Sequence, residues 1–449
     1  MKGRKNLLIG IGGVGMSALA QILLDKGESV AGVDRMIGTV DESAIPPSVK
    51  ALKAQGVPVS GDGDASAADG IERIVISTAI ESDHPILLRA AKENIPVVHR
   101  SEALAQALGA HRLLAVAGTC GKSTVTAILG HILEGCGFDP VVVNGAAIPG
   151  WDFGDSRVGS VRKPSNPLPD ESLRWAVAEV DESDKSLTAF KPDAAVITNA
   201  SADHFGIEET LELFDVFKKN VLGPVDDGRD GGSPQEIELG KWSGSFVENG
   251  IRYTIPQPGI HNVYNAWHAV KIATAIGADG ELAQKALATF PGVARRMQKV
   301  GELADGSGRK VAVVDDYAHN TEKLHAMWQA LSSEFPGGFA AVWRPHGYAP
   351  LRKMLEPLAE MFKSAVREQD TLFILPVYDA GGSANRDIKS DALIEKLSGS
   401  CKGTVKAVAD LDEAEKQMRE TASSVEALVT VGARDPGLCV LAKKLAGKI

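Results

Sequence analysis

Residues 115–124 read AVAGTCGKST, in which an apolar run enters a glycine-flanked turn and leaves it as Lys-Ser-Thr. The apolar run predicts a buried strand, and the pattern after Lys122 predicts a helix. Backbone N–H groups in such a turn, together with the helix N-terminus, form a site for phosphate oxygens. We therefore expect a nucleotide here, with Lys122 neutralising its β- and γ-phosphates and the Ser123 hydroxyl on Mg²⁺.

The turn is a shortened form of the usual phosphate-binding motif, because Val116 stands where that motif has a further glycine. A glycine turn with a chance Lys-Ser pair is the alternative, but the strand, the turn and the helix all favour phosphate binding. The residues expected around the phosphates are Gly118, Thr119, Cys120, Gly121, Lys122, Ser123 and Thr124.

The chain of 449 residues suits two or three domains. Apolar strands alternate with helical stretches, and this pattern opens the chain, restarts near position 111 and starts again near position 310. We expect three α/β domains in series: a Rossmann-like domain in 1–110, a central P-loop domain with a mostly parallel sheet in 111–296, and a Rossmann-like domain in 297–449. Segments 150–172 and 225–236, rich in glycine, proline or serine, are predicted to be loops.

Composition excludes several classes of protein. The net charge of -10 argues against a general nucleic-acid binder. No apolar run is long enough to span a bilayer, and the N-terminus leads into a strand pattern without the features of a signal peptide. The four cysteines show no paired or metal-ligand spacing. We expect a cytoplasmic protein that binds neither nucleic acid nor membrane, as a monomer or weak homodimer.

A second glycine motif, GIGGVG, follows a short strand predicted at 7–11. Gly10, Gly12 and Gly15 match G-x-G-x-x-G, and Asp34 ends the next strand, where a ribose-binding acid is expected. Taken alone, this pattern indicates NAD or FAD, or else a tight strand–helix packing with no ligand. With the first motif, it predicts two phosphate-bearing ligands on adjacent domains.

Carboxylates follow the strand in AVAEVDESD. Glu179 ends this strand, so it is expected to face the phosphate turn and to hold Mg²⁺ through its oxygen atoms. Asp181, Glu182 and Asp184 come just beyond, and an acidic loop without a role remains open for some of them. His204 follows the next strand in TNASADH, where a solvated loop histidine and a functional one are about equally plausible.

These pieces together resemble the Mur ligase family. The stretches that carry the resemblance, over nearly the full length, are GIGGVGMSALA, VISTAIESDHP, AVAGTCGKST, AEVDESDKS, TNASADH, PGIHNVYNA, FPGVARR, VDDYAHN and PVYDAGG. The most similar branch joins L-alanine to UDP-N-acetylmuramate in peptidoglycan precursor synthesis. The resemblance implies a UDP-sugar on the first domain, ATP with Mg²⁺ on the second and the amino acid on the third, which favours UDP over NAD.

The resemblance also implies the chemistry of an ADP-forming acid–amino-acid ligase. In this family the substrate carboxylate attacks the γ-phosphorus of ATP, and the amino group of the acceptor then displaces phosphate from the acyl phosphate. Two alternatives stay open. The acceptor could be another amino acid or a preformed peptide, or the chain could be a degenerate nucleotide-binding protein without activity.

Site residues follow from the resemblance position by position. It implies catalytic roles for Lys122, Glu179, His204 and His319, and metal binding by Ser123, Glu179 and His204. It adds to the ATP site His261, Asn265, Arg296 (or its neighbour Arg295) and Asp316. It places at the UDP site Gly10, Gly12, Gly13, Gly15, Met16, Asp34, Ser77 and Ala79. Lys219 is a weak counterpart of the carbamylated lysine of sister branches.

The acceptor region departs from the alanine-adding branch. That branch reads DDYGHHP where this chain reads DDYAHNT, and FQPHRYTRT where this chain reads WRPHGYAPL. Gly347 and Pro350 therefore replace two arginines expected at the acceptor carboxylate. Either Arg344 or Arg352 takes over that role, or the acceptor presents another group there. The acceptor site is expected to comprise Tyr317, His319, Arg344, His346 and Arg352.

Overall fold

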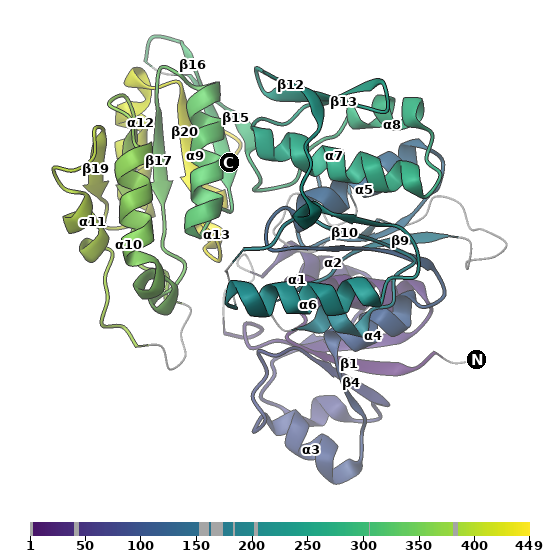
Figure 1. The fold of residues 1–449 in the computed structure, drawn as a ribbon. Helices are drawn as coiled ribbons and strands as arrows, with labels where there is room; N and C mark the ends of the chain where they lie inside the picture. The colour runs from purple at the N-terminus through teal and green to yellow at the C-terminus, as the bar shows by residue number, and fades with distance from the viewer. Residues whose placement is uncertain are drawn as a thin grey trace. The chain divides into compact units, whose positions relative to one another are not determined.

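The structure is a computed structural model of the whole chain, and it describes residues 3–39, 45–151, 161–162, 174–182, 185–201, 205–304, 306–379 and 385–449. The chain forms two compact units. The first comprises residues 1–236, 246–255 and 264–293, and the second comprises 237–245, 256–263 and 294–449. The helices and strands of both units are labelled in Figure 1.

A five-stranded parallel sheet opens the first unit, in the order β3-β2-β1-β4-β5. Its strands are β1 (Lys5–Ile9), β2 (Ser29–Val33), β3 (Val59–Ser60), β4 (Arg73–Ile76) and β5 (Val97–His99). Its helices are α1 (Val14–Asp25), α2 (Pro47–Ala54), η2 (Ala65–Ala68), α3 (Pro85–Glu93) and α4 (Arg100–Leu108). Helices α1, α2 and α4 pack on one face and α3 with η2 on the other, so the strands are buried on both faces.

A six-stranded sheet follows in the same unit, in the order β11-β10-β6-β9-β7-β8. Its strands are β6 (Arg112–Ala117), β7 (Val141–Val143), β8 (Val161–Arg162), β9 (Trp175–Glu179), β10 (Ala194–Ile197) and β11 (Val225–Asp227). Only the pairing of β8 with β7 is antiparallel among the described pairings of this sheet. The helical segments are α5 (Lys122–Gly135), η4 (Ser186–Ala189), α6 (Ile207–Lys219), η5 (Gly228–Asp230), α7 (Ile260–Ala275) and α8 (Gly280–Leu287).

One small sheet was not expected from the sequence. Strands β12 (Gln235–Gly240), β13 (Ser243–Glu248) and β14 (Ile251–Ile255) form a three-stranded sheet. The segment 225–236, predicted to be a loop, contains β11, η5 and the start of β12. Its glycines and Pro234 mark only the short connection between these elements. Most of the other predicted loop, 150–172, lies outside the described residues.

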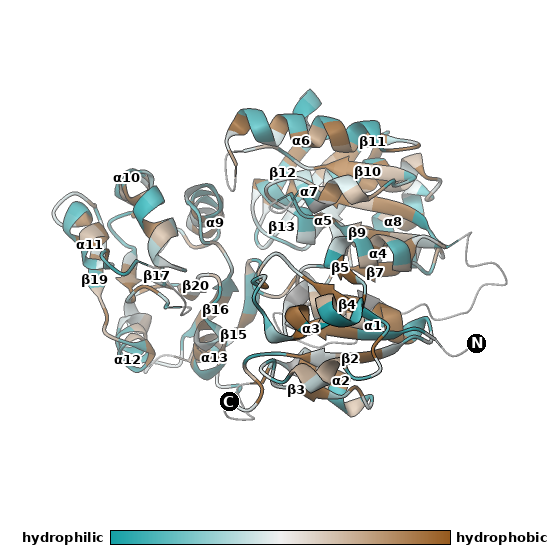
Figure 2. Cartoon of the chain, turned by 90° about the horizontal axis from the view of Figure 1, so that it is seen from below, coloured by the Kyte–Doolittle hydropathy of each residue, from teal (hydrophilic) through white to brown (hydrophobic). Residues whose placement is uncertain are grey.

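The second unit contains a six-stranded sheet in the order β15-β16-β20-β17-β18-β19. Its strands are β15 (Gln298–Ala304), β16 (Lys310–Asp316), β17 (Phe339–Trp343), β18 (Thr371–Ile374), β19 (Thr404–Ala407) and β20 (Ala427–Val431), of which β15 is antiparallel to its neighbour. Its helical segments are α9 (Thr321–Glu334), α10 (Tyr348–Ala365), α11 (Asp391–Leu397), α12 (Leu411–Thr421), η6 (Ala422–Ser424) and α13 (Pro436–Leu445). Helices α9 and α10 cover one face and α12 and α13 the other, and apolar residues concentrate in the strands between them (Figure 2).

The three large sheets, of five, six and six strands, confirm the predicted α/β fold with mostly parallel strands. In a parallel sheet the carboxyl ends of neighbouring strands meet at one edge, and ligands bind there. The turns after β1, β6, β9, β10, β16, β17 and β20 all leave from such edges. No helix of the described residues is long and apolar enough to cross a membrane.

Candidate active site

The turn at 118–121 joins β6 to α5 in a backbone conformation that requires glycine at both ends. Gly118 has φ of +127° and Gly121, at the N-cap of α5, has φ of +86°. A Cβ atom on Gly118 would lie 2.0 Å from the Thr198 hydroxyl oxygen, and one on Gly121 would lie 2.5 Å from Asn265 Oδ1. The predicted strand, turn and helix are therefore present, and backbone N–H groups of the turn lie at the N-terminus of α5.

Residues that follow β10 hold this turn from the side. The Thr119 hydroxyl and the Cys120 N–H both donate to Asn199 Oδ1, at 2.7 and 2.9 Å. The Asn199 amide and the Thr198 hydroxyl donate in return to the Cys120 carbonyl, at 3.0 and 2.6 Å. The turn is thus fixed before any ligand arrives, which reduces the ordering cost of binding.

Lys122 begins α5 and points back over the turn. Its Nζ donates to the Gly118 carbonyl at 2.7 Å and to Glu182 Oε2 at 2.6 Å, and it lies 3.9 Å from Asp181. Burial lowers the pKa of Lys122, but the charges of Glu182, Asp181 and Glu179 outweigh that effect, and the net pKa is raised. Lys122 therefore stays protonated, and Glu182 is its ion-pair partner, a role that the sequence did not distinguish among the acids of 179–184.

Ser123 and Glu179 form the candidate Mg²⁺ site. The Ser123 hydroxyl donates to Glu179 Oε2 at 2.8 Å, and the Gly145 N–H donates to the same oxygen at 2.7 Å. A hydroxyl and a carboxylate beside a phosphate-binding turn are oxygen ligands of the kind that Mg²⁺ prefers, so these two residues fit the expected ion. His204, the third expected ligand, lies outside the described residues. Within the described part of the chain, no group of three or more His, Cys, Asp or Glu side chains forms a metal site.

Helix α7 carries two residues expected at the adenine and ribose. Asn265 is buried, and it lies beside Gly121 of the phosphate turn. His261 lies one helical turn earlier on the same helix face. Burial lowers the pKa of His261 to about 4, so its imidazole is neutral at physiological pH and can accept or donate one hydrogen bond.

Arg295, Arg296 and Asp316 belong to the second unit, where two of them have structural partners. Asp316 is buried and accepts hydrogen bonds from the Met297 and Ala318 N–H groups, both at 2.7 Å. Arg295 is buried and pairs with Asp315 at 3.0 Å. Arg296 stacks over the Tyr317 ring at 5.1 Å and is partly exposed, so of the two arginines it is the one placed to reach a ligand.

The second glycine motif, GIGGVG at Gly10–Gly15, has the geometry expected of a diphosphate-binding turn. Gly10 has φ of +78°, and the Gly12 N–H donates to Asp34 Oδ2 at 2.9 Å. A Cβ atom on Gly15 would lie 2.1 Å from a guanidinium nitrogen of Arg100, which begins α4. This close approach places a cation beside the turn, and sequence reasoning missed it because Arg100 is distant along the chain.

The other expected UDP-site residues lie on the same sheet. Gly13 is the N-cap of α1, and Met16 is buried in the first turns of that helix. Ser77 and Ala79 follow the carboxyl end of β4, and β4 pairs with β1. The structure thus brings these residues to the same edge as Gly10.

In the second unit, the expected acceptor residues Tyr317, His319 and His346 come together. The ring centroids of Tyr317 and His319 are 5.5 Å apart, and those of His319 and His346 are 4.9 Å apart. His319 Nδ1 lies 3.0 Å from the Tyr317 carbonyl oxygen, which fixes a proton on Nδ1 and leaves Nε2 as an acceptor. Burial, with the nearby charges of Lys323 and His346, lowers the pKa of His319 to about 3.

Both arginines expected to bind the acceptor carboxylate are engaged elsewhere. Arg344 pairs with Asp435 at 2.6 Å and donates from Nε to the Pro376 carbonyl at 3.1 Å. Arg352 is exposed on α10 and pairs with Asp387. That one of them replaces the missing arginines stays a prediction, although each already pairs with a carboxylate of the protein.

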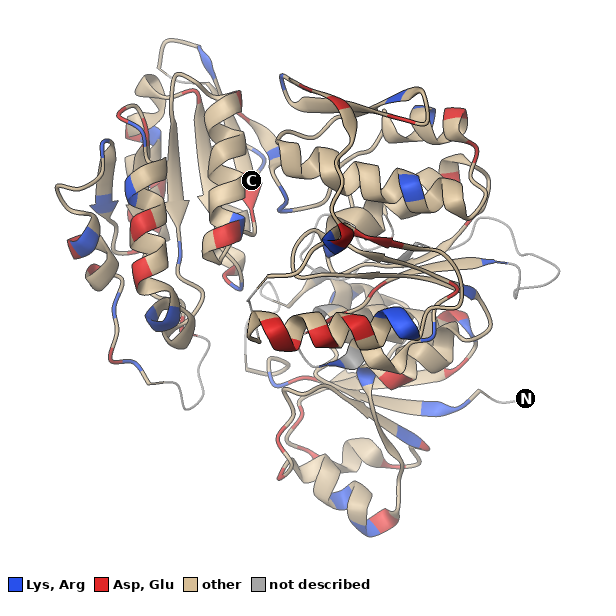
Figure 3. Ribbon diagram, viewed as in Figure 1, with Lys and Arg blue, Asp and Glu red and all other residues tan. Residues whose placement is uncertain are grey.

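Lys219 is the residue expected to correspond to the carbamylated lysine of sister branches. It is exposed at the C-terminal end of α6, which has 13 residues and so is about 20 Å long. Figure 3 shows the basic residues of α6 gathered at one end and acidic residues along the rest. The role expected of Lys219 stays a prediction.

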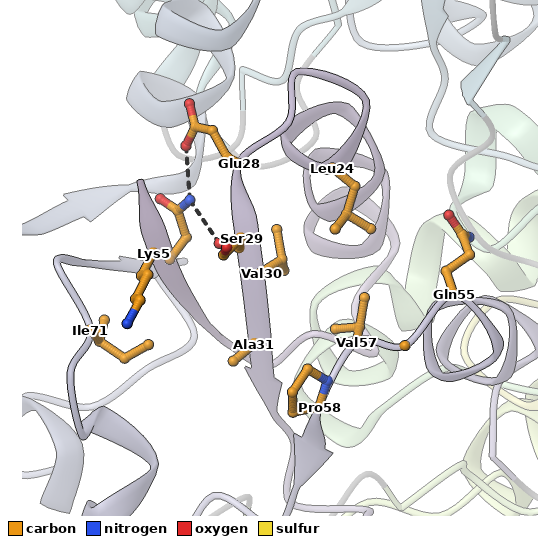
Figure 4. A pocket seen from close by; sticks show the side chains of 12 residues that line it. Lys5, Leu24, Glu28, Ser29, Val30, Ala31, Gln55, Val57, Pro58 and Ile71 are labelled. Atoms are coloured by element: carbon orange, nitrogen blue, oxygen red, sulfur yellow. Dashed lines mark hydrogen bonds between the residues drawn. The ribbon is translucent and has the colours of Figure 1, made fainter. Parts of the chain in front are cut away.

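A cavity of 430 Å³ lies in the first sheet domain, lined by residues including Lys5, Glu28, Ser29 and Gln55 (Figure 4). Lys5 and Ser29 begin β1 and β2, so this cavity is at the amino edge of the sheet, opposite Gly10. Its polar groups bond to one another, as in the 2.8 Å hydrogen bond from the Asn6 amide to Glu28. Ligands of such sheets bind at the other edge, so the cavity is not the candidate site.

Comparison with known families gives three matches along the chain. Residues 8–112 match the model described as Mur ligase family, catalytic domain. Residues 116–222 match the Mur ligase middle domain, and residues 295–434 match the Mur ligase, glutamate ligase domain. Together these matches cover most of the chain.

Individual relatives extend over nearly the same length. The UDP-N-acetylmuramate--L-alanine ligase of Novosphingobium aromaticivorans is 31% identical over 470 aligned residues, covering 95% of this chain and 93% of that protein. A protein of the same name from Burkholderia cenocepacia is 30% identical and covers 96% of this chain and 95% of its own. Among solved structures, the UDP-N-acetylmuramate-alanine ligase of Thermotoga maritima has a TM-score of 0.77 at 23% identity, covering 99% of this chain and 98% of that one. A murein peptide ligase from Psychrobacter arcticus has a TM-score of 0.63 at 18% identity, with 100% and 99% covered.

Proposed function

The chain belongs to the Mur ligase family, and we propose that it joins L-alanine to the carboxylate of UDP-N-acetylmuramate with conversion of ATP to ADP and phosphate. The observation that carries this proposal is the preformed phosphate turn with Lys122, Ser123 and Glu179 in contact around it. The names of the full-length relatives support the substrates. Peptidoglycan precursor synthesis is the process that this reaction serves.

The reaction has two steps. A carboxylate oxygen of the acyl substrate attacks the γ-phosphorus of ATP, the bond from that phosphorus to the β,γ-bridging oxygen breaks, and ADP leaves. The acceptor nitrogen then attacks the acyl carbon, the bond from that carbon to the phosphate oxygen breaks, and inorganic phosphate and a proton are released. Phosphorylation makes the carboxylate oxygen a leaving group, which it is not in the free acid.

The residues of the phosphate turn act on the charge of the first step. Backbone N–H groups at the N-terminus of α5 bind phosphate oxygens, and Lys122 moves from Glu182 toward the transferring phosphoryl group. Mg²⁺, when bound, neutralises charge on the phosphates, and Ser123 and Glu179 are the described residues that would hold it. Together these charges reduce the repulsion between ATP and an anionic attacking group.

The histidine pair of the second unit acts on the second step. His319 presents Nε2 as an acceptor, so it can accept a hydrogen bond from the acceptor amino group and orient its lone pair. A neutral His319 favours an unprotonated amine, because it adds no positive charge to the site.

The UDP part of the acyl substrate is proposed to bind at Gly10–Gly15, with Asp34 and Arg100 beside the turn.

The test is phosphate release from ATP with UDP-N-acetylmuramate and each amino acid supplied singly, with Mg²⁺ present. The proposal expects release that depends on both UDP-N-acetylmuramate and L-alanine. Release only with another amino acid or with a peptide would replace the acceptor but keep the ligase. No release with any acceptor, from a protein that binds ATP, would favour the degenerate nucleotide-binding protein. No disulfide joins the four cysteines, all of which lie in the described residues, and this supports the cytoplasm as the compartment.

A further inference from the structure

An amino acid acceptor brings an α-carboxylate into the site, and this charge needs a cationic partner. Leaving it without one in a partly dehydrated cleft is unfavourable. Arg344 and Arg352 each already balance a carboxylate of the protein, Asp435 and Asp387. Diverting Arg344 would leave the buried Asp435 without its cation, whereas Arg352 and Asp387 form an exposed pair that contributes little. A cation beside the histidine pair that has no protein partner would serve the substrate without the first cost.

The loop after β20 lies beside the loops that carry the histidine pair. The Gly432 N–H donates to the Asp316 carbonyl at 3.1 Å, and the Arg344 N–H donates to the Val431 carbonyl at 3.2 Å. The next residues of this loop include Arg434. A Cβ atom on Gly347, the neighbour of His346, would lie 3.8 Å from Arg434 Nη1. The guanidinium of Arg434 therefore occupies the space beside the position where the similar branch has an arginine.

Arg434 has the properties of a residue kept for a ligand. Its side chain is exposed, and it makes no hydrogen bond or ion pair with any residue that the structure describes. Its φ is +63°, a left-handed conformation that favours glycine and is uncommon for a long side chain. Strained backbone conformations cluster at functional sites. Glycine at this position would remove the strain, so the presence of arginine points to a function for its side chain.

Gly347, by contrast, does not need to be glycine. Its φ of 160° and ψ of 161° describe extended backbone that any residue adopts. The contacts that a Cβ atom would meet there, to Pro350 and Arg434, are at 3.4 to 3.8 Å, which is ordinary van der Waals distance. The backbone at position 347 thus permits an arginine, yet the chain has glycine there and carries an arginine at position 434 of the neighbouring loop.

We infer that Arg434 binds the α-carboxylate of the acceptor amino acid. The inference rests on the proposed function, because it assumes an acceptor with a free carboxylate. A guanidinium suits this role, since it can form two parallel hydrogen bonds with a carboxylate. Compared with the similar branch, the arginine lies in the loop after β20 instead of the loop after β17, and its charge is at the same edge of the sheet.

The experiment compares the wild type with Arg434→Gly in the amino-acid-dependent release of phosphate. We expect the variant to raise the KM for L-alanine about tenfold or more, with a smaller change in kcat and no change in the KM for ATP. Its melting temperature should not fall, because glycine suits the backbone at this position. Asn249→Gly is the matched control, since Asn249 also has positive φ, +50°, but lies in the turn between β13 and β14.

Two further measurements identify the charge that Arg434 recognises. The wild type should prefer L-alanine over L-alaninamide, which lacks the carboxylate, and Arg434→Gly should lose most of that preference. The double variant Gly347→Arg with Arg434→Gly should recover part of it. An unchanged KM and an unchanged preference in Arg434→Gly would overturn the inference while leaving the ligase intact. If the wild type accepts no amino acid or peptide, the proposed function fails first and the inference with it.

Discussion

Lys122 and Glu182 allow stability and activity to be separated in one pair of variants. Glu182 is 2% exposed, and its carboxylate is 2.6 Å from the Lys122 ammonium. Lys122→Met leaves this buried carboxylate without a partner, and breaking a buried pair in this way costs about 3 to 5 kcal/mol of stability. Replacing both partners by neutral groups is close to neutral, so Lys122→Met with Glu182→Gln should recover most of the loss.

Activity should not recover with stability. Removing one preorganised charge from the transferring group costs roughly 100- to 1,000-fold in kcat, and both variants lack the lysine. Urea unfolding measures the first effect, and phosphate release at saturating substrates measures the second. A single variant as stable as the wild type would refute the interpretation of Glu182. A double variant that turns over at the wild-type rate would refute the placement of the ATP phosphates.

The pH dependence of Lys122→Met checks the cause. Burial raises the pKa of Glu182 even with Lys122 present, and without the lysine it should rise further. The folded variant then binds more protons than its unfolded chain between the unfolded pKa, near 4.5, and the raised folded value. Stability therefore falls as pH rises through this window, and the deficit relative to the wild type should be smaller at about pH 5 than at about pH 8. A deficit that does not change with pH would exclude an unpaired carboxylate as its source.

Three other predictions test other parts of the site. Gly118→Ala should lower the melting temperature and raise the KM for ATP, since its Cβ atom would lie 2.0 Å from the Thr198 hydroxyl at a φ of +127°; normal values of both would contradict the geometry of the turn. Asp34→Asn should weaken UDP-N-acetylmuramate binding about tenfold in calorimetry with ATP binding unchanged, because its two carboxylate oxygens each accept a backbone N–H. The pKa of His319 is about 3 in the folded protein, so as pH falls the unfolded chain protonates this imidazole at a higher pH than the folded chain does. The free energy of unfolding therefore falls as pH drops below about 6.5. In urea unfolding, His319→Asn should show a shallower fall, and an equal fall in both proteins would exclude His319 as a contributor.

The sequence predicted those features that depend on neighbours along the chain. The two glycine turns are local, because a strand, a turn and a helix in succession place Gly10 and Gly118 without any knowledge of the rest of the fold. The mostly parallel sheets followed from continuous apolar strands separated by helices. Glu179 could be assigned to the phosphate turn because the carboxyl ends of neighbouring parallel strands must meet at one edge.

The features that the sequence did not predict depend on contacts between distant segments. Glu182 looks like its acidic neighbours until the fold brings Lys122 to it. Arg344 and Arg352 were expected to be available for the acceptor carboxylate, because their aspartate partners lie far along the chain. Arg434 could not be connected with Gly347, since only the pairing of β20 with β17 places the two loops together.

The ion pair between Lys122 and Glu182 also determines which anions can enter the phosphate turn. In the resting site the lysine charge is already balanced, so an incoming anion must displace a carboxylate before it gains the ammonium. A triphosphate that contacts the whole turn makes several N–H contacts in that exchange, whereas inorganic phosphate makes few. The phosphate released in each turnover should therefore be a weak product inhibitor, and the resting enzyme should discriminate against the small anions that surround it.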